Sequence, residues 1–324
     1  MLKVCMVGCG GISRAHRNAW ADIPEAKLVG ACDIRKEKLE PVVEEFGCNG
    51  YYDCDEMLEK EKPDILDICL PTYLHADFAV KALEKGVNVL TEKPISLKKE
   101  DVMRVYNAAK KADKRFMVAH VLRFWPEFVF VEEAYKNGTY GRLITGSMTR
   151  VGHTPKWSWD NWMKDVNRSG LVPFDLHIHD LDFIVSVFGE PQNVVCDRIS
   201  TDGQDAIHAV YHYPDFFIAT DAAWYDSYAF HAEFRFQFEK AVVELNRGTL
   251  TVYTDGQELH PFEEAQDGGK ANGINLPKTN AYFNEIRYFA DCVLAGKDCD
   301  RVKPEELIKV LEIIEVLDKE KRTI

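Results

Sequence analysis

The chain has 324 residues, of which 46% are hydrophobic and 29% are charged, a composition typical of globular proteins with room for two domains. Its formal net charge of −13 comes without a basic stripe, so we expect neither nucleic acid nor a membrane surface as a partner. The longest apolar runs are strand-sized, and the nine cysteines lack paired C-x-x-C spacing. These features predict reduced thiols in a cytoplasmic protein.

The first 120 residues alternate strand-like apolar runs with helical patterns. We expect strands at 2–7, 27–32, 64–69, 87–91 and 115–119, and helices near 12–22, 35–46, 74–85 and 98–112. Strands that alternate with helices indicate βαβ units, and right-handed crossovers wind such units into a doubly wound parallel sheet. The fold class predicted for this half is therefore α/β.

The pattern changes after Arg123. We expect a helix at 126–137, a strand at 143–151, an aromatic loop at 153–167, a helix at 173–188, strands at 192–200, 205–213, 216–224, 230–239, 241–246 and 249–254, and helices at 279–295 and 304–321. A run of strands with little helix between them predicts a large, mostly antiparallel sheet in an α+β domain. We therefore predict two domains, 1–122 and 123–324, with the closing helices able to pack back on the first.

A glycine-rich stretch, Gly8-Cys9-Gly10-Gly11-Ile12-Ser13, lies between the first strand and the first helix. Its glycines permit a tight turn and let backbone N–H groups approach a pyrophosphate at the positive end of the helix. Asp33 ends the second strand, where a carboxylate can hydrogen-bond a ribose 2′-hydroxyl and would repel a 2′-phosphate. This pattern favours NAD, although Arg35 could accommodate the phosphate of NADP. A tight turn beside a solvated acid is the alternative.

Glu92-Lys93-Pro94 follows the apolar run 87–91. A lysine at the carboxyl end of a buried strand costs desolvation, and the proline behind it forces the chain to turn. Ligands of open α/β sheets bind outside the carboxyl ends of the strands, so the position favours a ligand-facing Lys93. A solvated loop lysine is the alternative reading of the tripeptide.

The helix at 173–188 carries a polar stripe that begins with Asp175 and His179, one turn apart. A carboxylate beside an imidazole orients its tautomer and stabilises its protonated form, which suits a general base. His177 points about 200° away from His179 on ideal helix geometry, which argues against a metal clamp, and we predict no metal site. An amphipathic helix whose histidine sits at the core edge is the alternative.

The loop 153–167 contains Trp157, Trp159 and Trp162. Aromatic rings in such a loop stack on sugar faces or cover a nicotinamide, whereas a self-packed loop or a subunit interface explains them equally well. The shape of a substrate pocket is expected to depend on the loops 153–170 and 255–280.

Together these motifs resemble the Gfo/Idh/MocA family, named for glucose-fructose oxidoreductase and inositol dehydrogenase, along the whole chain. The marks of the resemblance are Gly8-x-Gly10-Gly11-Ile12, Pro71-Thr72-x-x-His75, Glu92-Lys93-Pro94, Arg123-Phe124-x-Pro126 and Asp175-x-x-x-His179. Two departures leave the substrate open: Ser169-Gly170-Leu171 replaces a longer glycine-rich stretch, and Pro173-Phe174 replaces an aliphatic pair.

The resemblance implies a Rossmann domain, a second domain with an open sheet, a homodimer or homotetramer, and hydride transfer between NAD(P) and a hydroxyl carbon of a sugar or cyclic polyol. Carried over by position, it assigns the cofactor to Gly8, Gly10, Gly11, Ile12, Asp33, Arg35, Leu70, Pro71, Thr72, His75, Glu92 and Lys93. It assigns substrate contacts to Arg123, Trp162, Asp175, His179 and Tyr282.

The resemblance also implies catalytic roles. Lys93 would hydrogen-bond the reacting oxygen, His179 would exchange the proton, and Asp175 would bind and orient. Proton flow through Lys93 is a variant of this scheme. Two other functions stay open: recycling of a tightly held NAD during sugar elimination or glycoside cleavage, and NAD binding by a non-catalytic regulator.

Overall fold

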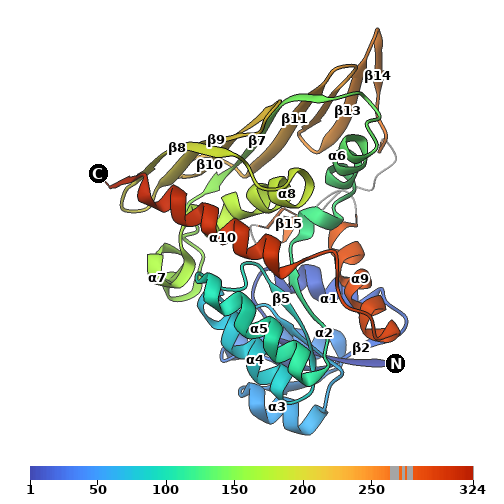
Figure 1. The fold of residues 1–324 in the computed structure, drawn as a ribbon. Coiled ribbons are helices and arrows are strands. Elements are labelled where there is room, and N and C mark those ends of the chain that lie inside the picture. The colour runs from blue at the N-terminus through green and yellow to red at the C-terminus, as the bar shows by residue number, and fades with distance from the viewer. Residues whose placement is uncertain (263–269, 272–273, 276–279, 324) are drawn as a thin grey trace. The chain divides into compact units, whose positions relative to one another are not determined.

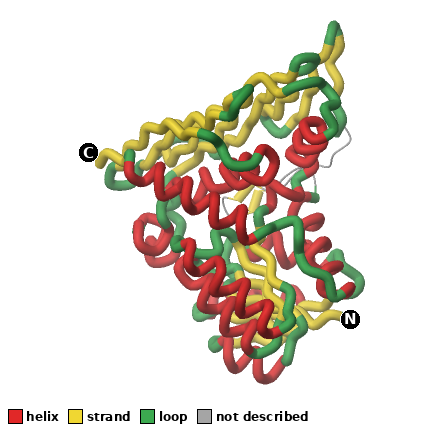
Figure 2. The backbone as a smooth tube through the Cα atoms, viewed as in Figure 1, coloured by secondary structure: helices red, strands yellow, loops and turns green. Residues whose placement is uncertain are grey.

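The computed structural model describes residues 1–262, 270–271, 274–275 and 280–323, so part of the expected pocket loop 255–280 lies outside the described residues. The chain forms two compact units. Unit 1 contains Met1–Val121, Asn280–Pro304 and a short hairpin of β15 (Lys270–Ala271) and β16 (Ile274–Asn275). Unit 2 contains the described parts of 122–268 and 305–323. Helices and strands alternate along the first 120 residues. In unit 2 most strands follow one another in the chain and form one layer, with the helices beside it (Figure 2).

Unit 1 is built on a six-stranded sheet in which all strands are parallel. Its order is β3-β2-β1-β4-β5-β6, with bounds Asn49–Tyr51, Ala26–Cys32, Leu2–Val7, Ile65–Ile68, Asn88–Glu92 and Phe116–Ala119. The strand order reverses between β1 and β4, and open α/β sheets bind ligands at such a switch point. The predicted doubly wound parallel sheet is confirmed.

The helices of this unit are α1 to α5 and α9, with bounds Ser13–Ala21, Lys36–Phe46, Cys54–Glu61, His75–Glu84, Lys99–Ala112 and Ala281–Ala295. Helix α9 packs on α1. Strand β3 and helix α3 were not predicted. The first has only three residues, and the second begins at an Asp53 cap whose carboxylate accepts the Glu56 N–H at 2.9 Å.

Unit 2 is built on a nine-stranded sheet in the order β14-β13-β12-β11-β7-β10-β9-β8-β17. The bounds of β7 to β14 are Leu143–His153, Asn193–Ser200, Asp205–His212, Phe217–Tyr225, His231–Phe238, Val242–Asn246, Thr249–Thr254 and Gln257–Leu259, and β17 is Lys321–Thr323. Neighbours are antiparallel except the pairs β7–β10 and β8–β17. The predicted, mostly antiparallel sheet is confirmed.

Three helices lie on one face of this sheet: α6 (Pro126–Lys136), α8 (Ile178–Phe188) and α10 (Pro304–Lys319) (Figure 1). Aromatic rings form the core between them, since the Phe128 ring lies 5.1 Å from that of Phe183 and 5.0 Å from that of Phe234, centroid to centroid. Among the described residues, no helix combines the length and the apolar character needed to cross a membrane.

Candidate functional site

The glycine-rich turn after β1 uses two of its glycines differently. Gly8 has a φ of +90°, and a Cβ there would lie 2.4 Å from the carbonyl oxygen of Cys69. A Cβ on Gly10 would meet no atom within 4 Å. Gly8 is therefore needed for the fold of the turn, whereas at Gly10 the space that a Cβ would occupy is open.

Helix α1 begins directly after this turn, with Ile12 at the N-cap position and no side-chain cap there among the described residues. Its first N–H groups are the positive end of a helix dipole, and anions bind at such ends. The Ser13 hydroxyl instead donates to the carbonyl of Gly10 at 2.7 Å, which fixes the turn. The open space at Gly10 and the uncapped helix end together fit a pyrophosphate.

Asp33 follows β2 and is 7% exposed. One carboxylate oxygen accepts the Cys9 N–H at 2.9 Å, and the other accepts the Arg35 N–H at 2.8 Å. The Arg35 Nε lies 3.4 Å from the second oxygen. The oxygen that accepts the Cys9 N–H keeps a further lone pair, so the carboxylate fits a ribose hydroxyl donor while it braces the glycine turn.

The segment after β4 contains Leu70 and Pro71 and the short 3₁₀ helix Thr72–Leu74. His75, which begins α4, places Nε2 2.6 Å from the Leu70 carbonyl oxygen and Nδ1 2.6 Å from that of Pro94. The imidazole therefore ties the segment after β4 to the segment after β5. Burial lowers the pKa of His75. Both ring nitrogens face backbone carbonyls, and the neutral ring that a lowered pKa favours donates to one of them while it packs between the two segments.

Lys93 directly follows β5, and its side chain is partly exposed. The Lys93 N–H donates to Oε2 of Glu92 at 3.0 Å, and the peptide bond to Pro94 is cis. The lysine thus stands at the carboxyl edge of the parallel sheet, the position that the sequence predicted.

Behind the Lys93 segment lies a buried polar network that was not predicted. His16 of α1 contacts Asp67 of β4 and Glu92 of β5. The available signal was Asp67 itself, because a carboxylate in the middle of an apolar strand is almost never fully buried without a partner.

In unit 2, the predicted helix at 173–188 is not uniformly α-helical. Residues Pro173–His177 form a π-helical turn, and the α-helix begins at Ile178. Asp175 therefore lies in the π turn and His179 in α8. The prediction that one regular α-helix contains both residues is wrong for Asp175. π turns inside helices occur frequently at functional sites.

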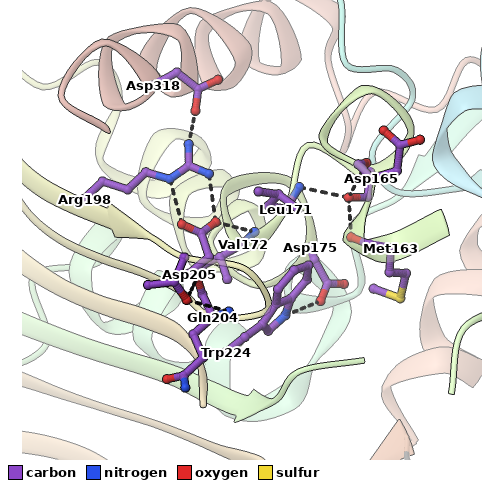
Figure 3. Close-up of polar contacts among 12 residues, drawn as sticks. Met163, Asp165, Leu171, Val172, Asp175, Arg198, Gln204, Asp205, Trp224 and Asp318 are labelled. Carbon is purple, nitrogen blue, oxygen red and sulfur yellow. Dashed lines mark hydrogen bonds and ion pairs between the residues drawn. The ribbon is translucent and has the colours of Figure 1, made fainter. Parts of the chain in front are cut away.

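Buried charges hold the start of this turn (Figure 3). The Val172 N–H donates to Asp205 Oδ2 at 3.1 Å, and Asp205 pairs with Arg198 at 2.8 Å. Both side chains of the pair are 1% exposed, and the Arg198 guanidinium also contacts Asp318 of α10. Since the charges are paired and hydrogen-bonded, the backbone that leads into Asp175 is fixed by residues of three other elements, β8, β9 and α10.

The Trp224 indole N–H of β10 donates to Asp175 Oδ2 at 3.0 Å (Figure 3). Asp175 and His179 are both partly exposed, while His177 is fully buried with Nε2 2.6 Å from the Tyr211 hydroxyl. Burial lowers the pKa of His177 to about 3, so this imidazole is neutral. The partly exposed pair is thus the chemically accessible part of this segment.

The other predicted substrate contacts are spread over the two units. Arg123 is 4% exposed, and its guanidinium pairs with Asp182 at 2.7 Å and also contacts Glu306. Trp162 lies in the 3₁₀ segment Trp159–Lys164 of unit 2. Tyr282 lies in the first turn of α9 in unit 1, with its ring centroid 6.1 Å from that of His16. Their contacts with a substrate stay predictions.

The parallel sheet, the glycine turn, the uncapped end of α1 and the braced acid after β2 define unit 1 as a dinucleotide-binding fold. Residues 2–120 match the family model described as an oxidoreductase family with an NAD-binding Rossmann fold. Residues 128–244 match the model for the GFO/IDH/MocA C-terminal domain. The chain belongs to the Gfo/Idh/MocA family.

Among curated relatives, D-apiose dehydrogenase of Paraburkholderia graminis is 30% identical over 58% of this chain and 50% of its own length. The 2,7-anhydro-N-acetylneuraminate hydratase of Escherichia coli is 29% identical over 50% of this chain and 44% of its own length. The chain therefore matches about half the length of these relatives.

The whole-chain fold is similar to that of myo-inositol 2-dehydrogenase from Lactobacillus plantarum, with a TM-score of 0.79 and 20% identity over 98% of this chain and 96% of that one. At this identity the likeness concerns the fold.

Proposed function

We propose that this protein is an NAD(P)-dependent oxidoreductase that transfers a hydride between the nicotinamide and a hydroxyl carbon of a sugar or cyclic polyol. The observation that carries the proposal is the open backbone at Gly10 beside the uncapped end of α1, with Asp33 braced behind it. Family membership and a related sugar dehydrogenase support the reaction class.

In this proposal unit 1 holds the cofactor. The N–H groups around Gly10 and at the start of α1 would hold the pyrophosphate, and Asp33 would accept a ribose hydroxyl. NAD, when bound, supplies the hydride acceptor. His75 would act through the backbone, because its ring lies between the carbonyls of Leu70 and Pro94, in the two segments that would border the nicotinamide.

The proton chemistry is assigned to three side chains. A carbinol carbon can lose hydride only if its hydroxyl loses a proton, and the Lys93 ammonium would stabilise the developing alkoxide. His179 would accept the proton as general base, and Asp175, held by the Trp224 indole, would orient the substrate. Proton acceptance by Lys93 is the variant.

The direct test is a panel of sugars and cyclic polyols incubated with purified protein and either NAD or NADP. We expect NADH to form in amounts that match the oxidised substrate for at least one panel member. A protein that binds NAD but turns over no member in either direction would contradict the proposal and favour a regulator.

The related hydratase favours a second candidate, in which a tightly held NAD is reduced and reoxidised within one turnover. Here the sugar is oxidised transiently, which permits elimination, and is then reduced again. Solvent deuterium should enter the sugar without net NADH. Stoichiometric NADH would exclude this candidate.

The two glycines of the turn give a matched pair of variants. Gly8→Ala should destabilise unit 1 by more than about 1 kcal/mol, because its Cβ would collide with backbone at a positive φ. Gly10→Ala should leave the unfolding free energy within about 0.5 kcal/mol but weaken NAD binding, because the methyl group fills the space assigned to the pyrophosphate. Urea denaturation and calorimetric titration with NAD measure the two effects. Equal effects of both variants on stability would contradict the assignment.

Cofactor preference should depend on the charge of Asp33. Asp33→Asn keeps an oxygen that can accept the Cys9 N–H but removes the charge that would repel a 2′-phosphate. We expect the ratio of NADP affinity to NAD affinity to rise by about tenfold or more. The Arg35 cation would attract the 2′-phosphate, and the negative charge of Asp33 would no longer repel it. Asp53→Asn, at a helix cap elsewhere in unit 1, is the control and should leave the ratio unchanged.

We also propose a cytoplasmic location and self-association. All nine cysteines are free thiols, which fits a reducing compartment. Val195, Ile199 and Phe217 are exposed apolar residues of β8 and β10, with exposed fractions of 54%, 39% and 45%. Such side chains on one sheet face suit a homodimer or homotetramer interface, which sedimentation analysis would test.

A further inference from the structure

Three buried ionisable groups from three elements meet behind Glu92. His16 Nδ1 lies 3.0 Å from both oxygens of Asp67, and His16 Nε2 lies 3.0 Å from Oε1 of Glu92. The side chains of His16 and Asp67 are fully buried, and that of Glu92 is 10% exposed. The Trp20 indole N–H donates to Asp67 Oδ2 at 2.7 Å.

The geometry fixes how many protons the imidazole carries. Each ring nitrogen faces a carboxylate oxygen, and a carboxylate can only accept. A neutral imidazole would satisfy one carboxylate and turn a lone pair toward the other. Burial alone would lower the pKa of His16, but the charge and hydrogen bond of Asp67 outweigh it and raise the pKa well above its usual value. Burial alone would raise the pKa of Glu92, but the bond and charge of His16 outweigh it and lower that pKa.

A metal ion is a poorer reading of the same residues. His16, Asp67 and Cys69 offer ligand atoms within 4.8 Å of one another, and they are the one such group among the described residues. However, a metal at His16 Nδ1 would displace the proton that Asp67 accepts, and Asp67 also receives the Trp20 N–H. Hydrogen bonds therefore account for the cluster.

The network reaches the Lys93 segment through Glu92. While Oε1 faces His16, Oε2 accepts the backbone N–H of Lys93 at 3.0 Å. On the other side of Lys93, the Pro94 carbonyl oxygen lies 2.6 Å from His75 Nδ1. The main chain of Lys93 is thus held on both sides by groups that a buried imidazole contacts.

We propose that His16 is a positioning residue that, as an imidazolium locked between Asp67 and Glu92, fixes the Glu92 carboxylate and through it the backbone of Lys93. This role rests on the proposed function of Lys93, since His16 itself is fully buried and is not assigned to substrate or cofactor. Loss of the His16 contacts to Asp67 and Glu92 should lower kcat more than it raises KM. A small displacement of a catalytic group reduces the stabilisation of the transition state more than the binding of the substrate.

Two substitutions separate the contact of His16 with Glu92 from its contact with Asp67. The amide nitrogen of glutamine reaches the position of Nε2 and that of asparagine the position of Nδ1. We therefore expect His16→Gln, which keeps a neutral bond to Glu92, to lower kcat by roughly tenfold. We expect His16→Asn, which leaves Oε1 of the buried Glu92 without its donor, to lower kcat by about 10²-fold with KM changed less than about threefold. His208→Asn, at an exposed histidine of unit 2, is the matched control and should leave kcat unchanged.

A double-mutant cycle with Glu92→Gln tests whether His16 acts through Glu92. In a protein that already carries Glu92→Gln, adding His16→Asn should lower kcat by less than about a further twofold. Additive losses in kcat, or a folded His16→Asn protein with wild-type kcat, would overturn the proposal.

A second measurement needs neither turnover nor a folded variant. Wild-type protein labelled with nitrogen-15 histidine should show one residue whose two ring nitrogens are both protonated and stay so at mildly alkaline pH. A neutral tautomer for every buried histidine would overturn the proposal. If no panel substrate is turned over, the proposed function fails, and this spectrum decides the inference about His16 separately.

Discussion

Replacement of Lys93 by alanine is expected to lower kcat by about 10²- to 10⁴-fold while NAD binding is retained. The ammonium is assigned to the oxygen that becomes an alkoxide, so its loss removes stabilisation that exists mainly in the transition state. The pyrophosphate and ribose contacts assigned to the glycine turn and Asp33 do not involve this side chain. Steady-state kinetics with the best panel substrate, together with calorimetric titration of NAD, measure the two quantities.

Lys98→Ala is the control for this variant, because Lys98 is an exposed lysine five positions along the same segment. It should leave kcat and KM unchanged. His179→Ala should also lower kcat strongly, since the general base is removed. If the proteins carrying Lys93→Ala and His179→Ala both keep wild-type turnover, the assignment of the catalytic residues is wrong.

The largest expected effect on stability concerns the pair between Arg198 and Asp205. Arg198→Ala should lower the free energy of unfolding of unit 2 by about 3–5 kcal/mol, because it leaves the Asp205 charge buried and unpaired. Five of the six tryptophans lie in unit 2, so urea denaturation followed by tryptophan fluorescence reports mainly on this unit.

The control for this stability change is Arg235→Ala. Arg235 pairs with Glu244 across β11 and β12, but its side chain is 62% exposed, and such surface pairs contribute about 0–1 kcal/mol. A similar loss for the two arginine variants would mean that burial does not govern the contribution of the Arg198 pair.

The sequence predicted those features that depend on local patterns. The strands between 192 and 254 were found because strand-like stretches follow one another there with little helix between them. The glycine turn and Asp33 were found because chemistry, order and spacing agree over one βαβ unit. Strand β3 was missed because three residues carry too little pattern, and the π turn was missed because its residues fit α-helical spacing equally well.

The polar networks were missed for a different reason. His16 meets partners that are 51 and 76 positions away in the chain, and Asp205 meets the backbone of Val172 across 33 positions. Such pairings depend on which strands become neighbours and on which face each side chain lies. Local periodicity carries neither kind of information, so only the three-dimensional structure shows that these groups meet.

The double role of Asp33 constrains how this protein could evolve. The carboxylate accepts the Cys9 N–H inside the turn and is also the group expected to select between cofactors. A lineage that changed its cofactor by replacing Asp33 with a basic residue would lose an acceptor for a buried N–H in the same step. Asparagine or serine at this position would keep an acceptor. The shortest mutational route to a new cofactor preference therefore passes through a neutral polar residue.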